Sequence, residues 1–273
     1  MMQVQVLADG RLHLNHGPID LICQAWGSGR ARAFDRAVAR FDGLLEELVA
    51  ELPALRAEEA RLSGPVARAM QAAVQPFRPV FITPMVAVAG AVAEAALAAM
   101  VAGPGVERAY VNNGGDIAVH LTPGQRLSCA MAQGGMVELR AADVVRGIAT
   151  SGWRGRSWSL GIADAVTVLA RTAAMADAAA TMIANAVDLP GHPAISRRPA
   201  VEMQADSDLG SRLVTVAVGA LSPDEVALAL HRGREAALAF QARGLIEGAA
   251  LFLQGQVQVA GQMALTGREV AHV

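Results

Sequence analysis

Short apolar segments separated by turn residues fill the middle of the chain, and they constrain its fold more than any other feature of the sequence. Apolar runs of this length, bounded by Gly, Asn, Asp and Ser, are typical of strands joined by tight turns. The middle of the protein is therefore predicted to be a sheet. The expected strands are residues 106–111, 117–121, 126–130, 136–139, 147–150, 157–162 and 165–169, with two or three more in 3–23, one at 213–218 and a hairpin at 251–259.

Segments with helical spacing flank this sheet. In residues 31–52 the apolar side chains recur at steps of three and four, as one face of a helix requires. Strands flanked by long helices in mixed order predict an α+β fold with a mixed sheet core. No flexible linker divides the chain, so residues 1–273 are expected to form a single domain. The other expected helices are residues 68–74, an alanine-rich helix that begins near Pro84, residues 172–187 and a helix that opens at Ser222.

Composition excludes several classes of function. The 23 basic residues are all arginine, which rules out a Schiff-base lysine, a pyridoxal phosphate anchor and a P-loop lysine. The formal net charge is only −2 and the arginines are scattered, so neither nucleic acid nor an anionic membrane surface is an expected partner. The 53% apolar content is enough for a large core.

Three further features bear on compartment and ligands. Cys23 and Cys129 lie far apart without a CxxC or Cys/His spacing, so they are expected to be buried free thiols. The first ten residues lack a basic and then apolar leader, which predicts a cytoplasmic protein. The apolar stretch at residues 80–101 is interrupted by Pro84, Gly90 and Glu94, so a buried helix of small residues is preferred to a membrane span.

Asn113, Gly114, Gly115 and Asp116 follow one predicted strand and precede the next. The two glycines allow the chain to pass close to a ligand, and Asp116 offers an acceptor. An ordinary hairpin turn, with Asn and Asp in their usual turn roles, explains the same residues.

Asp177 and Thr181 are four residues apart in the predicted helix 172–187, hence on one helical face. A carboxylate and a hydroxyl at this spacing can ligate one hard cation. Alternatively Thr181 faces solvent or bonds a backbone carbonyl. Asp177 lies among alanines and methionines, and a buried carboxylate requires a partner.

Thr150, Ser151 and Gly152 end a predicted strand, and Trp153 and Arg154 follow them. Hydroxyls, a glycine, an arginine and an aromatic ring suit a phosphate and a stacked heterocycle. A plain polar loop is the alternative for this segment.

Taken in order, these motifs resemble those of the ApbE superfamily, the FAD:protein FMN transferases. The resemblance rests on Asn113 to Asp116, Ala149 to Gly152, Val166 to Val168, and Ala176, Asp177 and Thr181. It extends upstream to residues 83–94. The segments at residues 16–20 and 161–167 look like a soluble, poorly characterised prokaryotic subgroup of ApbE-like proteins.

The resemblance implies a set of ligands and roles. Asp177 and Thr181 match the residues that bind Mg²⁺, which bridges the pyrophosphate of FAD while FMN is transferred. Asn113, Gly114, Gly115 and Asp116 match the turn in the nucleotide pocket, and Thr150, Ser151 and Gly152 would line the same site. The implied ligands are therefore Mg²⁺ and FAD or FMN, and the implied partner is a small-molecule nucleotide.

Two departures from the family pattern affect the predicted chemistry. Ala89 stands where the family usually has a lysine, and residues 159–164 replace the stretch that carries the catalytic histidine. Proton transfer would then depend on Asp164 or Asp116. The alternatives are a protein that binds a flavin or pterin without turnover and a homo-oligomeric structural protein.

Overall fold

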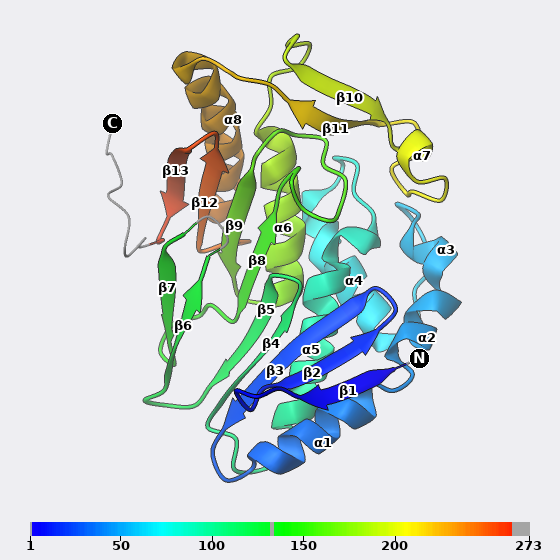
Figure 1. The fold of residues 1–273 in the computed structure, drawn as a ribbon, viewed down its shortest axis with the longest axis vertical. Helices are drawn as coiled ribbons and strands as arrows, with labels where there is room; N and C mark the ends of the chain where they lie inside the picture. Colours follow the sequence, from blue (N-terminus) through cyan, green and yellow to red (C-terminus); the bar gives the residue numbers. More distant parts are fainter. Residues whose placement is uncertain (1, 132–133, 264–273) are drawn as a thin grey trace. The chain divides into compact units, whose positions relative to one another are not determined.

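The computed structural model describes residues 2–131 and 134–263, which form an α+β fold with a large antiparallel sheet, as predicted (Figure 1). The fold divides into two compact units that alternate along the sequence. The single-domain assignment stays a prediction. Unit 1 is built from the described parts of Met1–Ser128, Glu138–Ala149 and Ala170–Asp177, and unit 2 from those of Cys129–Val137, Thr150–Leu169 and Ala178–Val273.

The strands of unit 1 follow one another as antiparallel neighbours in the order β1, β2, β3, β4, β5. Residues alternate along β3, so Leu21, Cys23 and Ala25 point into the core. The start of β8 (Gly147–Ser151) pairs with β5 through Ile117 and Ile148. The bounds are β1 Gln3–Val6, β2 Leu12–His16, β3 Ile19–Trp26, β4 Arg108–Asn113 and β5 Asp116–Leu121, so the strands predicted in these regions are confirmed.

Helices cover one face of these strands, where α5 packs on β4 and β5 and is contacted by α1 and α4 (Figure 1). The single helix predicted over residues 31–52 is wrong. Gly43 has a φ of 78° and Asp42 is extended, so the chain breaks there into separate helices. The bounds are α1 Arg30–Phe41, α2 Leu44–Ala50, α3 Leu52–Leu55, α4 Pro65–Val74, the 3₁₀ turns η1 Gln75–Phe77 and η2 Pro84–Ala87, and α5 Val88–Val101.

Helix α5 is the apolar element on which unit 1 is built. With η2 it forms the described segment Pro84–Val101, which by length and composition alone is apolar enough to cross a membrane, and half of that segment is buried in the protein. At its C-terminus the guanidinium of Arg36 donates to the carbonyls of Ala99, at 2.9 Å, and Met100. A cation at the C-terminus of a helix also interacts favourably with the helix dipole. These contacts are those of a core helix.

In unit 2 the antiparallel strands β9, β12 and β13 are neighbours in that order, and α8 packs on β12 and β13. Helix α6 (Ala173–Ala186) is continuous, with its residues up to Asp177 in unit 1. The remaining bounds are β9 Ala165–Ala170, β12 Gly248–Leu253, β13 Gln256–Gly261, α8 Pro223–Ala242, the pair β10 Ile195–Pro199 and β11 Leu213–Val218, α7 Ala200–Met203, and the hairpin β6 Arg126–Ala130 and β7 Met136–Arg140.

Residues 157–162, predicted as a strand, have no regular secondary structure. The side-chain oxygen of Asn185 accepts from the Leu160 N–H at 3.0 Å. The chain also runs against helix α6 so closely that a Cβ at Gly161 would lie 2.0 Å from the Ala184 carbonyl oxygen. The Leu160 N–H therefore bonds a side chain of α6, and the Ile162 N–H bonds the Val187 carbonyl at 2.8 Å, so this segment does not form a strand ladder of its own. Strand β10 and helix α7 were not predicted.

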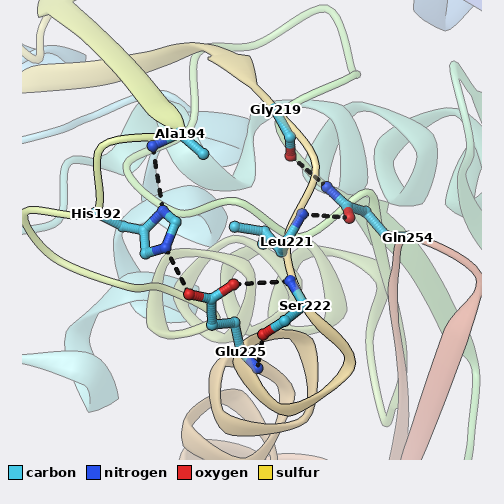
Figure 2. Close-up of polar contacts among 7 residues, drawn as sticks. All are labelled: His192, Ala194, Gly219, Leu221, Ser222, Glu225 and Gln254. Carbon is cyan, nitrogen blue, oxygen red and sulfur yellow. Dashed lines mark hydrogen bonds and ion pairs between the residues drawn. The ribbon is translucent and has the colours of Figure 1, made fainter.

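The N-terminus of α8 is the predicted capping site, and it is stabilised by a wider network of polar contacts (Figure 2). Ser222 Oγ accepts from the Glu225 N–H, and Glu225 accepts from the Ser222 N–H at 2.7 Å. His192 Nδ1 accepts from Ala194, so its proton is on Nε2, which donates to Glu225 at 2.8 Å. The Ser222 N–H and the His192 ring are the main groups that lower the pKa of Glu225 to about 2.

We expect Glu225→Gln to remove a pH-dependent part of the stability. A carboxylate whose pKa is lower in the folded state stabilises the fold above its unfolded pKa of 4.5, and this contribution is lost as the pH falls toward about 2. Urea denaturation of both proteins at a series of pH values should show a difference at pH 7 that shrinks below pH ~4.5. Asp224→Asn, which neutralises an exposed acid in the same turn, should not reproduce it.

Candidate functional site

Asp177 projects from the first turns of α6 into the core of unit 1, where only 9% of its surface is exposed. Its Oδ2 accepts a hydrogen bond of 3.0 Å from the backbone N–H of Gly90, and the Ala89 N–H also stabilises the carboxylate. These N–H groups belong to the first turn of α5, whose N-cap is Ala87. Because alanine has no side-chain acceptor, Asp177 serves as the acceptor for this helix end.

A second carboxylate, Asp116, lies beside Asp177 in the same unit and is equally buried, with 8% of its surface exposed. Burial is the largest cause that raises the pKa of Asp177 well above its ordinary value, and the charge of Asp116 adds to it. The N–H bonds from Gly90 and Ala89 offset only part of this effect. Two neighbouring buried carboxylates require either a proton or a cation to reduce their repulsion.

The turn that holds Asp116 is the predicted glycine-hinged hairpin between β4 and β5. Asn113 and Asp116 are cross-strand partners, and between them Gly114 and Gly115 have φ values of 65° and 116°. A Cβ at Gly115 would meet no atom within 4 Å, so the turn faces open space on that side. The buried Asn113 side chain donates to the Ala89 carbonyl at 3.1 Å and so fixes the turn to the start of α5.

The other predicted binding residues form a second set, in unit 2. Thr181 Oγ1 donates to Ser151 Oγ at 3.3 Å, and the hydroxyls of Thr150 and Thr167 are 2.9 Å apart. Thr181 and Ser151 were predicted as neighbours in one site, and they are in contact. The pairing of Thr181 with Asp177 as ligands of one metal ion stays a prediction.

Asp164 lies in a separate cluster of unit 2. It accepts from Arg154 Nε at 2.7 Å, from the Trp153 indole at 3.3 Å and from the backbone N–H of Gln254 at 2.6 Å. Arg154 also lies over the ring of Trp153, 4.7 Å from its centroid. Arg154 and Trp153, which were expected to hold a phosphate and a heterocycle, therefore have partners within the protein. These contacts are typical of a structural ion pair, and catalysis by Asp164 stays a prediction.

Two residues that sequence reasoning did not assign to the site contribute to its framework. Glu94 on α5 accepts from the Ala174 N–H at 3.1 Å, at the start of α6. Asn185 accepts from Ser159 and Leu160. The spacing of Asn185, four residues beyond Thr181, was a usable signal. Glu94 carried a signal only as a charge inside an apolar helix.

The site offers few protein side chains that could bind a cation. Among the residues that the structure describes, no three or more His, Cys, Asp and Glu side chains are grouped to hold a metal ion. Asp116 and Asp177 supply two carboxylates, which suits Mg²⁺ because this ion usually keeps several waters and takes further oxygens from substrate phosphates. The pair fits magnesium better than zinc, which prefers a closed set of nitrogen and sulfur ligands.

Comparisons with known proteins bear on the family. A model of the family described as AbpE bacteria matches residues 4–259. A UPF0280 protein of Methanopyrus kandleri is 42% identical over 124 residues, which are 44% of this chain and 48% of that protein. A UPF0280 protein of Methanothrix thermoacetophila is 40% identical over 111 residues, 39% of this chain and 46% of the relative. The alignments thus span about half the length of these curated relatives.

We predict that Asp177→Asn stabilises the protein in the absence of divalent cations. An acid whose pKa is raised in the folded state binds its proton more tightly there, so its contribution to stability falls as the pH rises above 3.8. The neutral amide of asparagine removes this penalty, and its oxygen still accepts from Gly90. Melting temperatures at pH 7 in a chelator test this. A lower melting temperature for the variant would contradict this prediction, because it would show that the charged carboxylate stabilises the fold without a cation.

Both cysteines were predicted to be buried; Cys23 is buried, whereas Cys129 is half-buried. Desolvation nevertheless leaves both of them poor nucleophiles, which yields a prediction on their reactivity. Both are free thiols in the described part of the chain, and desolvation raises the pKa of Cys23 to about 12 and that of Cys129 to about 11. At pH 8 a thiol reagent should therefore label the native protein slowly and the denatured protein quickly, because the thiolate is the reactive form. Fast labelling of the native protein at either position would contradict this.

Proposed function

We propose that this chain, which belongs to the AbpE bacteria family, is a magnesium-dependent enzyme that acts on a flavin nucleotide. The observation that carries the proposal is the buried acidic pair, Asp116 and Asp177, beside the glycine turn of the β4–β5 hairpin. A pair of buried carboxylates is costly for the fold, and a costly arrangement is expected where function requires it. The likeness of these motifs to the ApbE superfamily supplies the substrate class.

In this proposal Asp177 and Asp116 hold Mg²⁺, with the Thr181 hydroxyl as the further ligand that the resemblance implies. When bound, the ion would neutralise charge on the pyrophosphate of FAD and favour departure of AMP as the leaving group. Asn113 and the turn at Gly114 and Gly115 would shape the nucleotide pocket, with Thr150, Ser151 and Gly152 as further lining residues. Asn113 would act by holding the turn against the start of α5.

The proposed reaction class is cleavage of FAD or transfer of FMN. Hydrolysis of the pyrophosphate converts FAD and water to FMN and AMP, whereas transfer moves FMN to a hydroxyl of an acceptor and releases AMP. Both require a group that takes a proton from the attacking oxygen. Asp164 is engaged by Arg154, Trp153 and Gln254. Asp116 is therefore the preferred candidate, and it would accept the proton on the carboxylate oxygen that does not bind the ion.

A specific observation favours a second candidate function, a protein that binds a flavin or pterin without turnover. The position of the family's histidine stretch is occupied here by Ser159, whose Oγ is 3.3 Å from Asn185 Oδ1 and 3.2 Å from the Gly161 N–H. A hydroxyl with these contacts stabilises the local structure and does not act as a base. Under this alternative the acidic pair and the turn bind the ligand but no product forms.

The remaining expectations on partners belong to the proposal as well. We propose a cytoplasmic protein that has no nucleic-acid or membrane partner, in keeping with its scattered arginines and net charge of −2. Self-association is compatible with β1, a sheet edge on which Val4 and Val6 are exposed. An edge strand without charged residues or proline is open to pairing with another chain.

The proposal predicts Mg²⁺-dependent turnover of FAD that the conservative change Asp177→Asn abolishes. Asparagine keeps an oxygen acceptor for Gly90 but loses the charge that attracts the ion, so binding of Mg²⁺ should fail while the fold persists. Product formation followed by chromatography, with Mg²⁺ added or chelated, measures the effect. Asp35→Asn, on the exposed side of α1, is the matched control.

Each outcome distinguishes the two candidate functions. FMN and AMP from the wild type, but not from Asp177→Asn, support the enzyme. Tight calorimetric binding of FAD without product after long incubation supports the binding protein. A ligand at a hundredfold excess over its Kd should add roughly 2.7 kcal/mol of apparent stability. A wild type that neither binds FAD nor shows metal-dependent turnover contradicts both.

A further inference from the structure

We propose that Glu94 is a positioning residue for Asp177, because each of the two carboxylates binds the N-terminus of the helix that carries the other. We name this arrangement the reciprocal clamp: Glu94 on α5 with the first turn of α6, and Asp177 on α6 with the first turn of α5. The proposal rests on the proposed function insofar as Asp177 is taken to hold the cation. All of its residues lie in unit 1.

Glu94 provides one half of the clamp. Its Oε1 accepts the Ala174 N–H at 3.1 Å, and the Ala173 N–H and the Thr172 hydroxyl also bond the carboxylate. The Thr172 hydroxyl in turn accepts from the Met175 N–H at 3.2 Å. The first N–H groups of a helix have no partner within the helix, so a carboxylate from another helix is well suited to bind them.

Asp177 provides the other half, one turn further along α6. It binds the N–H groups of Ala89 and Gly90. The start of α5 has no cap of its own, since Ala87 occupies the N-cap position without a side-chain bond. Each helix therefore receives an acceptor for its first turn from the other, and α6 also has its own acceptor in Thr172. This reciprocity fixes the two carboxylates with respect to both helix starts.

Backbone contact between the two helices makes the position of Asp177 sensitive to Glu94. A Cβ added at Gly90 would lie 2.3 Å from the carbonyl oxygen of Ala173, so the two first turns touch without intervening side chains. Any displacement of Ala173 and Ala174 moves the next turn, which carries Asp177. Glu94 bonds the N–H groups of Ala173 and Ala174 and so holds this turn of α6 in place. In this way it fixes the position of Asp177 without touching it.

The chemistry of Glu94 is that of a positioning residue and not merely of a stabilising one. Glu94 is a half-buried carboxylate in a helix made mainly of alanine and valine, and desolvation raises its pKa. Burial disfavours the charged form of this carboxylate, and the bonds to the start of α6 offset part of that cost. A carboxylate that binds the start of α6 is expected if α6 must be held in one position. Partners that orient a metal ligand typically tune metal affinity by 10–100-fold.

The test compares Glu94→Ala and Glu94→Gln with Asp35→Asn, which removes an exposed charge from unit 1. Two readouts are needed: the affinity for Mg²⁺ by calorimetry, and the amide resonances of Ala89 and Gly90, whose N–H groups bond the carboxylate of Asp177 and not that of Glu94. Glu94→Ala should weaken Mg²⁺ binding roughly tenfold or more and shift both amide resonances. Glu94→Gln, which keeps a neutral acceptor, should show smaller changes of the same kind, and Asp35→Asn should show none.

Unchanged Mg²⁺ affinity together with unchanged Ala89 and Gly90 resonances in Glu94→Ala would overturn the positioning role. If the wild type itself binds no Mg²⁺, the proposed function fails, and the amide resonances alone then decide the clamp: a shift supports it and no shift overturns it. Should Glu94→Ala not fold, the same two comparisons are made with Glu94→Gln, and an unchanged result there counts against the proposal.

Discussion

The burial of two neighbouring carboxylates, which also repel each other, is the constraint on which the candidate site in unit 1 depends. Asp177 and Asp116 are almost fully removed from water, and each disfavours the charge of the other. The protein offsets this with backbone N–H groups from the start of α5, but these donors do not restore the ordinary pKa of Asp177. The negative charge that these donors do not compensate must be balanced by a proton or a cation. The folded protein keeps both carboxylates buried, so this need persists.

Helix α5 shows how an apolar element can serve such a site. Its body is alanine and valine packed on β4 and β5, while its ends are held by ionic side chains, Asp177 at the N-terminus and Arg36 at the C-terminus. This polarity matches the helix dipole at both ends. The same helix thus provides hydrophobic burial for unit 1 and a backbone surface against which the acidic pair lies. The small residue Gly90 permits this close approach.

Local patterns predicted much of the fold and part of the site, and the failures have physical causes. The β4–β5 turn, the cap of α8 and the helix that carries Asp177 and Thr181 depend on residues close in sequence, so they were predictable. The break at Gly43 follows from a left-handed conformation that periodicity does not reveal. Residues 157–162 bond Asn185, and Glu94 bonds α6 some 80 residues away. Such long-range partners leave no local pattern.

The spacing of polar residues along α6 does not by itself distinguish a metal site from a set of structural clamps. Asp177, Thr181 and Asn185 lie four residues apart along α6, and each bonds a different segment. Asp177 bonds Gly90, Thr181 bonds Ser151, and Asn185 bonds Ser159 and Leu160. Neutral side chains are sufficient for the last two contacts. Only Asp177 carries a charge that its donors do not fully compensate, next to a second acid. A capping role would be served equally well by asparagine, so the retained charge favours a ligand that requires it.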